Sequence, residues 1–92
     1  MEPSRVRRSF VLDTSVLIHD PDALFAFDEH ELILPYVVVH EVDGLRHSPN
    51  GRGAAANQVV RHLEELRLKQ PSLRDVPLGD QGGLLSVYLP DG

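Results

Sequence analysis

The sequence predicts a single small α/β domain built around a parallel sheet. Short apolar runs, which are typical of buried strands, alternate along the chain with segments that carry apolar residues at helical spacing. The length of 92 residues suits one domain with a modest core. Apolar residues make up 41% of the chain, but it has no Trp, three Phe and two Tyr, so we expect Leu and Val to fill the core.

The first expected strand is "SFVLD", residues 9–13. It follows a polar segment, residues 1–8, that we expect to be a flexible leader before a domain spanning residues 9–92. A short continuous apolar run of this kind is typical of a parallel strand that is covered on both faces. A turn or a short helix is expected directly after it.

A short amphipathic helix and a second strand come next. In "HDPDALFAFDEH", Asp20 stands directly before Pro21, which is the arrangement of a helix N-cap followed by proline at the first helical position. Leu24 and Phe27 then recur at helical spacing. The run "ELILP", residues 31–35, is expected to be the second strand, ended by its proline.

Residues 36–47, "YVVVHEVDGLRH", are expected to be helical. Four positions recur in this segment at helical spacing, namely Val38, Glu41, Val42 and Leu45. The three consecutive valines would suit a strand equally well. The helix is favoured by the period and by Pro35 just upstream.

The best helix of the chain is expected over residues 54–69. It follows a loop-like segment, residues 48–53, and begins with three alanines, which have high helix propensity. Its apolar stripe consists of Val59, Leu63 and Leu66. Residues 70–83 are rich in turn formers and are expected to connect this helix to a last strand, residues 84–90.

The formal charge is −5 in total and is unevenly distributed. An acidic protein is not expected to bind nucleic acid in general, because such affinity comes from Lys and Arg that neutralise phosphates. Residues 44–69, however, hold five of the nine basic residues and only two of the fourteen acidic ones. Either a solvated helix face or a path for RNA would explain this basic segment.

Cysteine is absent, which excludes disulfides and thiolate metal sites and is typical of a reducing compartment. No apolar run approaches the roughly 20 residues that a membrane helix needs, and the N-terminus lacks the features of a secretory signal. We therefore expect a soluble, cytoplasmic protein with no membrane partner. The five His are scattered without a helical His-x-x-x-His pair, so no zinc site is expected.

Asp13 is the first candidate for chemistry, because it follows the first expected strand. Ligands of open parallel sheets gather outside the carboxyl ends of the strands. Thr14 and Ser15 could cap the turn and hydrogen-bond the carboxylate, which would then suit a hard cation such as Mg²⁺ or Mn²⁺. An aspartate in this position is more often a helix or turn cap, and spacing alone leaves both roles open.

Glu41 is the second candidate. It lies between Val38 and Val42 on the apolar stripe of its expected helix, where a charge is costly unless it has a partner or an ion. Asp43, two positions on, is expected to point elsewhere and to be solvated. A pairing of Glu41 with Arg46 or Arg52 would explain its position equally well.

Three ordered segments of the chain resemble a known family. They are the strand-ending Asp13 with Thr14 and Ser15, the segment "HDPDALFAFDEHE", and "LPYVVVHEVDGLR", which carries Glu41. Together they resemble the start of a PIN domain, and specifically the amino-terminal PIN domain of the PhoH-like ATPase family, in which a PIN nuclease precedes a P-loop ATPase. "GRGAAANQVVRHLEELR" and "GGLLSVYLPDG" are similar to the family's next helix and strand, so the resemblance spans roughly residues 9–91.

The resemblance implies a PIN-like (5′-nuclease/RNase H-like) three-layer sandwich with a central parallel sheet, incomplete at its C-terminal side. It also implies a divalent-metal-dependent endoribonuclease that hydrolyses phosphodiester bonds in single-stranded RNA. Carried over to this chain, Asp13 and Glu41 would be catalytic ligands of Mg²⁺ or Mn²⁺, and Thr14 or Ser15 would position Asp13.

Two arginines are candidates for contacts with nucleic acid. Arg52 stands in the loop before the long expected helix, where it could meet the phosphate backbone of RNA, and Arg46 is the weaker candidate. This assignment follows from charge and place in the chain.

The chain departs from the family in what it lacks. PIN domains complete their acidic cluster with further aspartates from later segments, and no acid after Glu41 has that placement. Asp91 follows a strand, but no catalytic role is transferred to it. A GxxxxGK[ST] phosphate-binding motif is also absent. We therefore expect the N-terminal portion of a PIN domain, with weak metal binding and little nuclease activity.

Other classes of function remain open. A PIN-like module without chemistry could bind RNA or a protein partner as a regulatory domain. Aspartate-nucleophile phosphatases also place an acid at a strand end, but they need a second Asp two residues on, where this chain has Ser15. An incomplete sheet would expose a strand edge, so a homo-oligomer or poor stability in isolation is expected as well.

Overall fold

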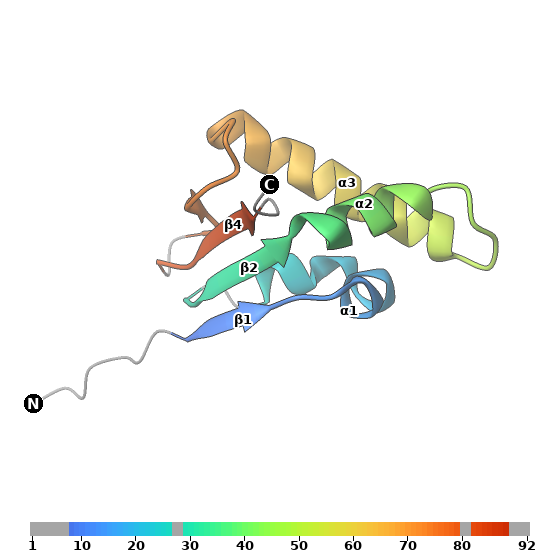
Figure 1. The fold of residues 1–92 in the computed structure, drawn as a ribbon, viewed down its shortest axis with the longest axis horizontal. Helices are drawn as coiled ribbons and strands as arrows, with labels where there is room; N and C mark the ends of the chain where they lie inside the picture. Colours follow the sequence, from blue (N-terminus) through green and yellow to red (C-terminus); the bar gives the residue numbers. More distant parts are fainter. Residues whose placement is uncertain (1–7, 27–28, 80–81, 89–92) are drawn as a thin grey trace, which may run out of the picture.

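The computed structural model describes residues 8–26, 29–79 and 82–88 (Figure 1). Four strands form one sheet in the order β1-β2-β4-β3. Three of them are parallel, β1 (Ser9–Val11), β2 (Glu31–Pro35) and β4 (Leu84–Tyr88), and β3 (Val76–Pro77) pairs antiparallel with β4. The predicted α/β fold with a mainly parallel sheet is therefore confirmed.

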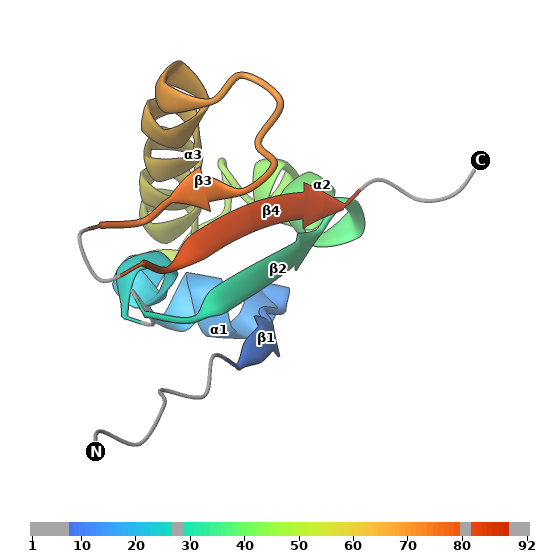
Figure 2. The ribbon, with the colours of Figure 1, turned by 90° about the vertical axis from the view of Figure 1, so that its left-hand side faces the viewer.

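The helices gather on one face of this sheet, as Figure 2 shows. They are α1 (Thr14–His19), the 3₁₀ helix η1 (Pro21–Phe25), α2 (Tyr36–Gly44) and α3 (Arg52–Lys69). α1 contacts η1, α2 and α3, and α2 contacts α3. Within the described ranges no helix covers the other face, so two layers of the expected three-layer sandwich are present, in agreement with an incomplete fold.

The core is aliphatic, as the composition predicts. Along β2 the buried Leu32 and Leu34 alternate with partly exposed residues, so the leucines point toward the helices. The buried apolar side chains of the described residues are Leu12, Leu17, Ala23, Leu24, Leu32, Leu34, Val38, Val42, Ala56, Val59, Leu63, Leu66, Val76, Leu78 and Leu85. Among the described helices, none has the length and apolar character that a bilayer crossing requires.

The N-terminal elements differ from the prediction in their ends. β1 is shorter than expected, because it ends at Val11 and α1 already begins at Thr14. Asp20 caps the next helix as predicted, since its side chain accepts a hydrogen bond of 3.2 Å from the amide of Asp22. That helix is a 3₁₀ turn rather than an α-helix, and Phe27, like the expected leader before Arg8, lies outside the described residues.

The later elements are also shifted at their ends. α2 ends three residues before the predicted residue 47, and α3 begins two residues before the predicted residue 54. β3 was not predicted, because a strand of two residues that includes Pro77 gives no alternating pattern in the sequence. It lies at the edge of the sheet, where a proline without an amide hydrogen is tolerated.

The loop between α2 and α3 is held by a tight network. The amide of Gly53 donates to the carbonyl of Ser48 over 3.2 Å. The side-chain amide of Asn57 donates to the carbonyl oxygens of Arg46, at 3.1 Å, and Gly53, at 2.9 Å, and its oxygen accepts from Nε of Arg46 at 2.8 Å. This network fixes where α3 starts, and with it the position of Arg52.

Candidate active site

Asp13 lies where the chain leaves the carboxyl end of β1. The preceding Leu12 is buried and its amide still donates to the carbonyl of Ile33 in β2, whereas Asp13 is exposed. Oδ1 of Asp13 accepts a hydrogen bond of 3.0 Å from the amide of Val16, so Asp13 is the N-cap of α1. The cap occupies one oxygen and leaves the charged group facing solvent.

Glu41 comes to the same region from α2. Its Oε1 accepts a hydrogen bond of 2.6 Å from the hydroxyl of Thr14, a length typical of a bond to an ionised carboxylate. The prediction that Glu41 lies on the apolar stripe is wrong, because the side chain is exposed while Val38 and Val42 are buried. The helix turns Val38 and Val42 to the core and leaves the Glu41 side chain exposed, within hydrogen-bond reach of Thr14 in α1.

Thr14 links the two segments that carry the acids. Thr14 follows Asp13 directly, so their Cα atoms lie about 3.8 Å apart, and it also bonds the carboxylate of Glu41. We expected Thr14 or Ser15 to bond Asp13. The bond that the structure contains runs from Thr14 to Glu41 instead, and no hydrogen bond from Ser15 to Asp13 occurs among the described residues.

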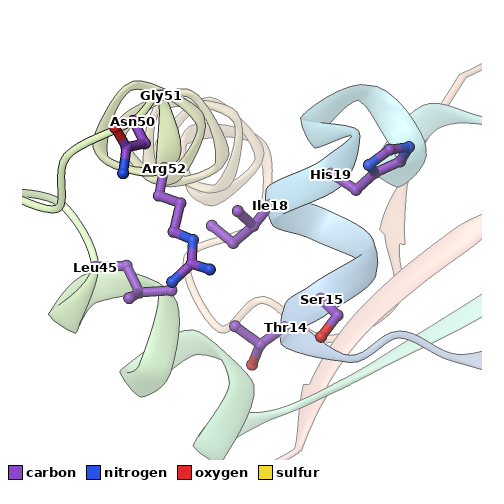
Figure 3. Close-up of a pocket in the computed structure, with 8 residues that line it drawn as sticks. All are labelled: Thr14, Ser15, Ile18, His19, Leu45, Asn50, Gly51 and Arg52. Carbon is purple, nitrogen blue, oxygen red and sulfur yellow. The ribbon is translucent and has the colours of Figure 1, made fainter.

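A pocket of about 540 Å³ opens beside Thr14, and neither acid lines it. It is lined by Thr14, Ser15, Ile18, His19, Leu45, Asn50, Gly51 and Arg52 (Figure 3). Arg52 extends from the first turn of α3 toward Leu45 and Thr14. Its side chain forms no ion pair or hydrogen bond with any residue that the structure describes, so its charge is available to an anion in the pocket.

Arg46, the other arginine candidate, has a different environment. Its Nε donates to Asn57, and its Nη1 lies 3.5 Å from a carboxylate oxygen of Asp43. Asp43 is mostly exposed, as expected, but it is paired. Arg46 does not line the pocket, and its contacts give it a structural role in the α2–α3 loop. Asn57, which organises this loop, was missed, although an Asn side chain in a helix can bond the backbone four residues earlier, as it does here with Gly53.

The donor set at this edge suits a divalent cation of the hard type. Two carboxylates and a hydroxyl supply only oxygen atoms, which Mg²⁺ and Mn²⁺ prefer. Proteins usually hold Mg²⁺ through one or two carboxylates, and waters and substrate phosphates complete its shell. Across the ranges that the structure describes, no cluster of three or more acidic or His side chains could hold an ion. The residues fit an ion shared with water and substrate rather than a closed protein cage.

Comparison with known proteins identifies the family of the chain. Residues 10–81, which include both acids and Arg52, match a family model described as "PIN domain". No solved structure matches the chain at a significant level.

Three relatives share the name Protein PhoH2. The chain is 45% identical over 83 residues to the protein of Mycolicibacterium smegmatis, 42% over 83 residues to that of Thermobispora bispora, and 41% over 80 residues to that of Bacillus subtilis. These alignments cover 89%, 89% and 87% of this chain, but only 19%, 18% and 18% of the relatives. The chain thus spans about a fifth of the length of the curated relatives that it matches.

Proposed function

The chain belongs to the PIN domain family, and from this premise we propose that it carries the N-terminal part of a metal-dependent endoribonuclease centre that acts on single-stranded RNA. PIN domains are in general a metal-dependent nuclease fold. The observation that carries the proposal is the hydrogen bond between Thr14 and Glu41, which ties the Glu41 carboxylate of α2 to the residue that follows Asp13.

In this proposal each residue of the centre has a separate role. Asp13 and Glu41 hold Mg²⁺ or Mn²⁺, and the hydroxyl of Thr14 fixes the orientation of the Glu41 carboxylate. A bound divalent ion would supply an activated water and would neutralise charge on the scissile phosphate. Arg52 faces the neighbouring pocket and binds a phosphate of the RNA backbone. Arg46 acts through the loop that carries Arg52.

The 92 residues are expected to hold the ion weakly. Two carboxylates leave most of the coordination shell to water, and the relatives are about five times as long as the part that matches. We propose that the remaining ligands, and the P-loop ATPase module of PhoH-like proteins, belong to sequence outside these residues. The lack of cysteine further supports a cytoplasmic location.

The proposal is tested by incubating single-stranded RNA with the chain, with and without Mn²⁺. Slow cleavage that requires the metal is expected, together with paramagnetic broadening of the amide signals around Asp13 and Glu41. A non-catalytic module is the second candidate, since the described residues lack a third acidic ligand. If the chain binds the RNA without cutting it, and Mn²⁺ broadens no signal near either acid, the nuclease proposal is wrong and the binding module is favoured.

Removal of the Thr14 hydroxyl should weaken metal binding. In Thr14→Val the shape of the side chain is kept, but Glu41 loses its 2.6 Å hydrogen bond and its fixed orientation. Losses of about 10–100-fold in metal affinity are typical when such a supporting contact is removed. Mn²⁺ titrations followed by NMR broadening measure the effect. Ser15→Ala is the matched control, because that neighbouring hydroxyl bonds no residue among those described; equal losses in both variants would contradict the role of Thr14.

Self-association is expected through the outer edge of β1. In the described part of the chain β1 pairs only with β2, so its other edge has no strand beside it. Val11, at the end of β1, is 65% exposed. Sedimentation velocity should show species larger than a monomer, and their share should fall in Val11→Lys, since charge on an edge strand opposes pairing. A purely monomeric profile of the unmodified chain would contradict this expectation.

A further inference from the structure

The chain has two tyrosines and no tryptophan, and both tyrosines are exposed. Tyr36 is 43% exposed and Tyr88 is 42% exposed. In a small domain whose core is short of large side chains, burial of an aromatic ring would be the favourable choice. Single exposed apolar residues need no explanation, but these two lie at the same edge of the molecule.

That edge is the carboxyl end of the parallel strands, where the acidic pair also lies. Tyr88 is the last residue of β4 and pairs in register with Pro35, and Tyr36 follows Pro35 directly. Asp13 follows β1, the strand on the other side of β2. Neighbouring strands are about 4.8 Å apart, so Tyr88 lies roughly 10 Å from the strand that leads to Asp13. The strand order therefore brings Asp13, Tyr36 and Tyr88 to one edge of the sheet.

Each ring has a partner that suits nucleic acid. The rings of Tyr36 and His40 are nearly parallel, with centroids 6.4 Å apart and an angle of 26° between their planes. Cζ of Arg74 lies 4.9 Å from the centroid of the Tyr88 ring. Arg74 forms no ion pair with the described residues, so its charge can meet a phosphate while its plane lies on the ring.

There is also room for a base beside Tyr36. A hollow of about 270 Å³ lies between α2 and α3, and both Tyr36 and His40 line it. Its lining combines apolar side chains, among them Leu63 and Leu73, with the charged Asp43, Glu64 and Arg67. Proteins that recognise single-stranded RNA stack its unpaired bases on aromatic side chains. A hollow next to the Tyr36 ring gives such a base a place to lie.

We propose that Tyr36 and Tyr88 form a stacking track for the bases of single-stranded RNA beside the metal site. Arg74 contacts the RNA backbone next to Tyr88, and His40 supports the ring of Tyr36. The proposal rests on the proposed nuclease function for its choice of RNA as the partner. Stacking itself needs no metal ion, so the track can be tested apart from cleavage.

The two tyrosines are the only strong fluorophores of the chain, which makes the test specific. The 92-residue chain is titrated with oligouridylate in EDTA at low salt, and tyrosine emission is followed. We expect saturable quenching in the unmodified chain and also in Tyr36→Phe and Tyr88→Phe, where one reporter remains in each. Anisotropy of labelled oligouridylate should show binding about 5–150-fold weaker in Tyr36→Leu and Tyr88→Leu, the range typical of one lost stacking contact.

Controls separate stacking from charge and from folding. Leu68→Ala, at a residue that is 86% exposed on α3, should leave the affinity unchanged. Thermal unfolding checks that the Leu variants remain folded. Binding without quenching, quenching of one tyrosine alone, an unchanged affinity in both Leu variants, or no binding at all would each overturn the track. Cleavage that depends on Mn²⁺ and Asp13 can persist in any of these cases, so failure of the track is distinguishable from failure of the nuclease proposal.

Discussion

Replacing Asp13 with asparagine is expected to remove Mn²⁺ binding and metal-dependent RNA cleavage while leaving the fold intact. Asparagine caps helices as well as aspartate does, so the bond from the Val16 amide should survive. The negative charge is lost, and with it one of the two carboxylates at the site. Because removal of a mere supporting contact lowers metal affinity about 10–100-fold, loss of a ligand should exceed about 100-fold.

The experiment compares Mn²⁺-induced NMR broadening, RNA cleavage and thermal unfolding in three variants. Asp13→Asn should show neither Mn²⁺-induced broadening nor RNA cleavage, and its unfolding temperature should be unchanged. Asp13→Ala should in addition lose about 0.5–2 kcal/mol of stability, because the cap is gone. Asp43→Asn is the charge-matched control on the helix that carries Glu41. If Asp43→Asn weakened Mn²⁺ binding as much as Asp13→Asn, the effect would come from the negative charge of the protein as a whole and not from coordination of the ion by Asp13.

Gly53→Ala is expected to destabilise the fold strongly. A Cβ at this position would lie 2.7 Å from the carbonyl oxygens of both Arg46 and Ser48, and neither backbone atom can move without breaking the loop network. Overpacking of this kind costs about 1–3 kcal/mol or more. At about 4–8 °C per kcal/mol for a domain of this size, a cost of about 3 kcal/mol lowers the unfolding temperature by roughly 12–24 °C.

Gly44→Ala is the matched control, because nothing lies within 4 Å of a Cβ at that position near the end of α2. Its unfolding temperature should stay close to that of the unmodified chain or rise slightly, since alanine favours the helix. Differential scanning calorimetry on Gly53→Ala and Gly44→Ala measures both unfolding temperatures. Equal unfolding temperatures for the two would mean that the α2–α3 loop relaxes freely and does not fix Arg52.

Much of the fold follows from patterns within short segments. β2 was predicted over the same five residues that the structure contains, because an apolar run bounded by a proline is informative by itself. The start of α3 was placed too late, since Arg52 and Gly53 resemble loop residues, and only contacts with Ser48 and Asn57 extend the helix over them. β3 depends on its partner β4 and has no signal of its own.

The site shows the same division between local and distant information. Asp13 was identified from its place after a strand, which is a local property. The exposure of Glu41 depends on how α2 rotates against α1 and the core, so its stripe position was assigned wrongly although the residue was identified as a candidate. The partner of Thr14 is 27 residues away in sequence, and spacing carries no information about it. Likewise, Arg46 could not be separated from Arg52 by charge alone.

The absence of a linker between β2 and α2 has a consequence for how sequence length can vary. The strand ends at Pro35 and the helix starts at Tyr36, so the rotational phase of Glu41 about the helix axis is set by counting residues from the sheet. Each added residue would turn Glu41 by about 100° and advance it about 1.5 Å, away from the hydroxyl that it meets. Insertions and deletions during evolution should therefore be excluded from this junction.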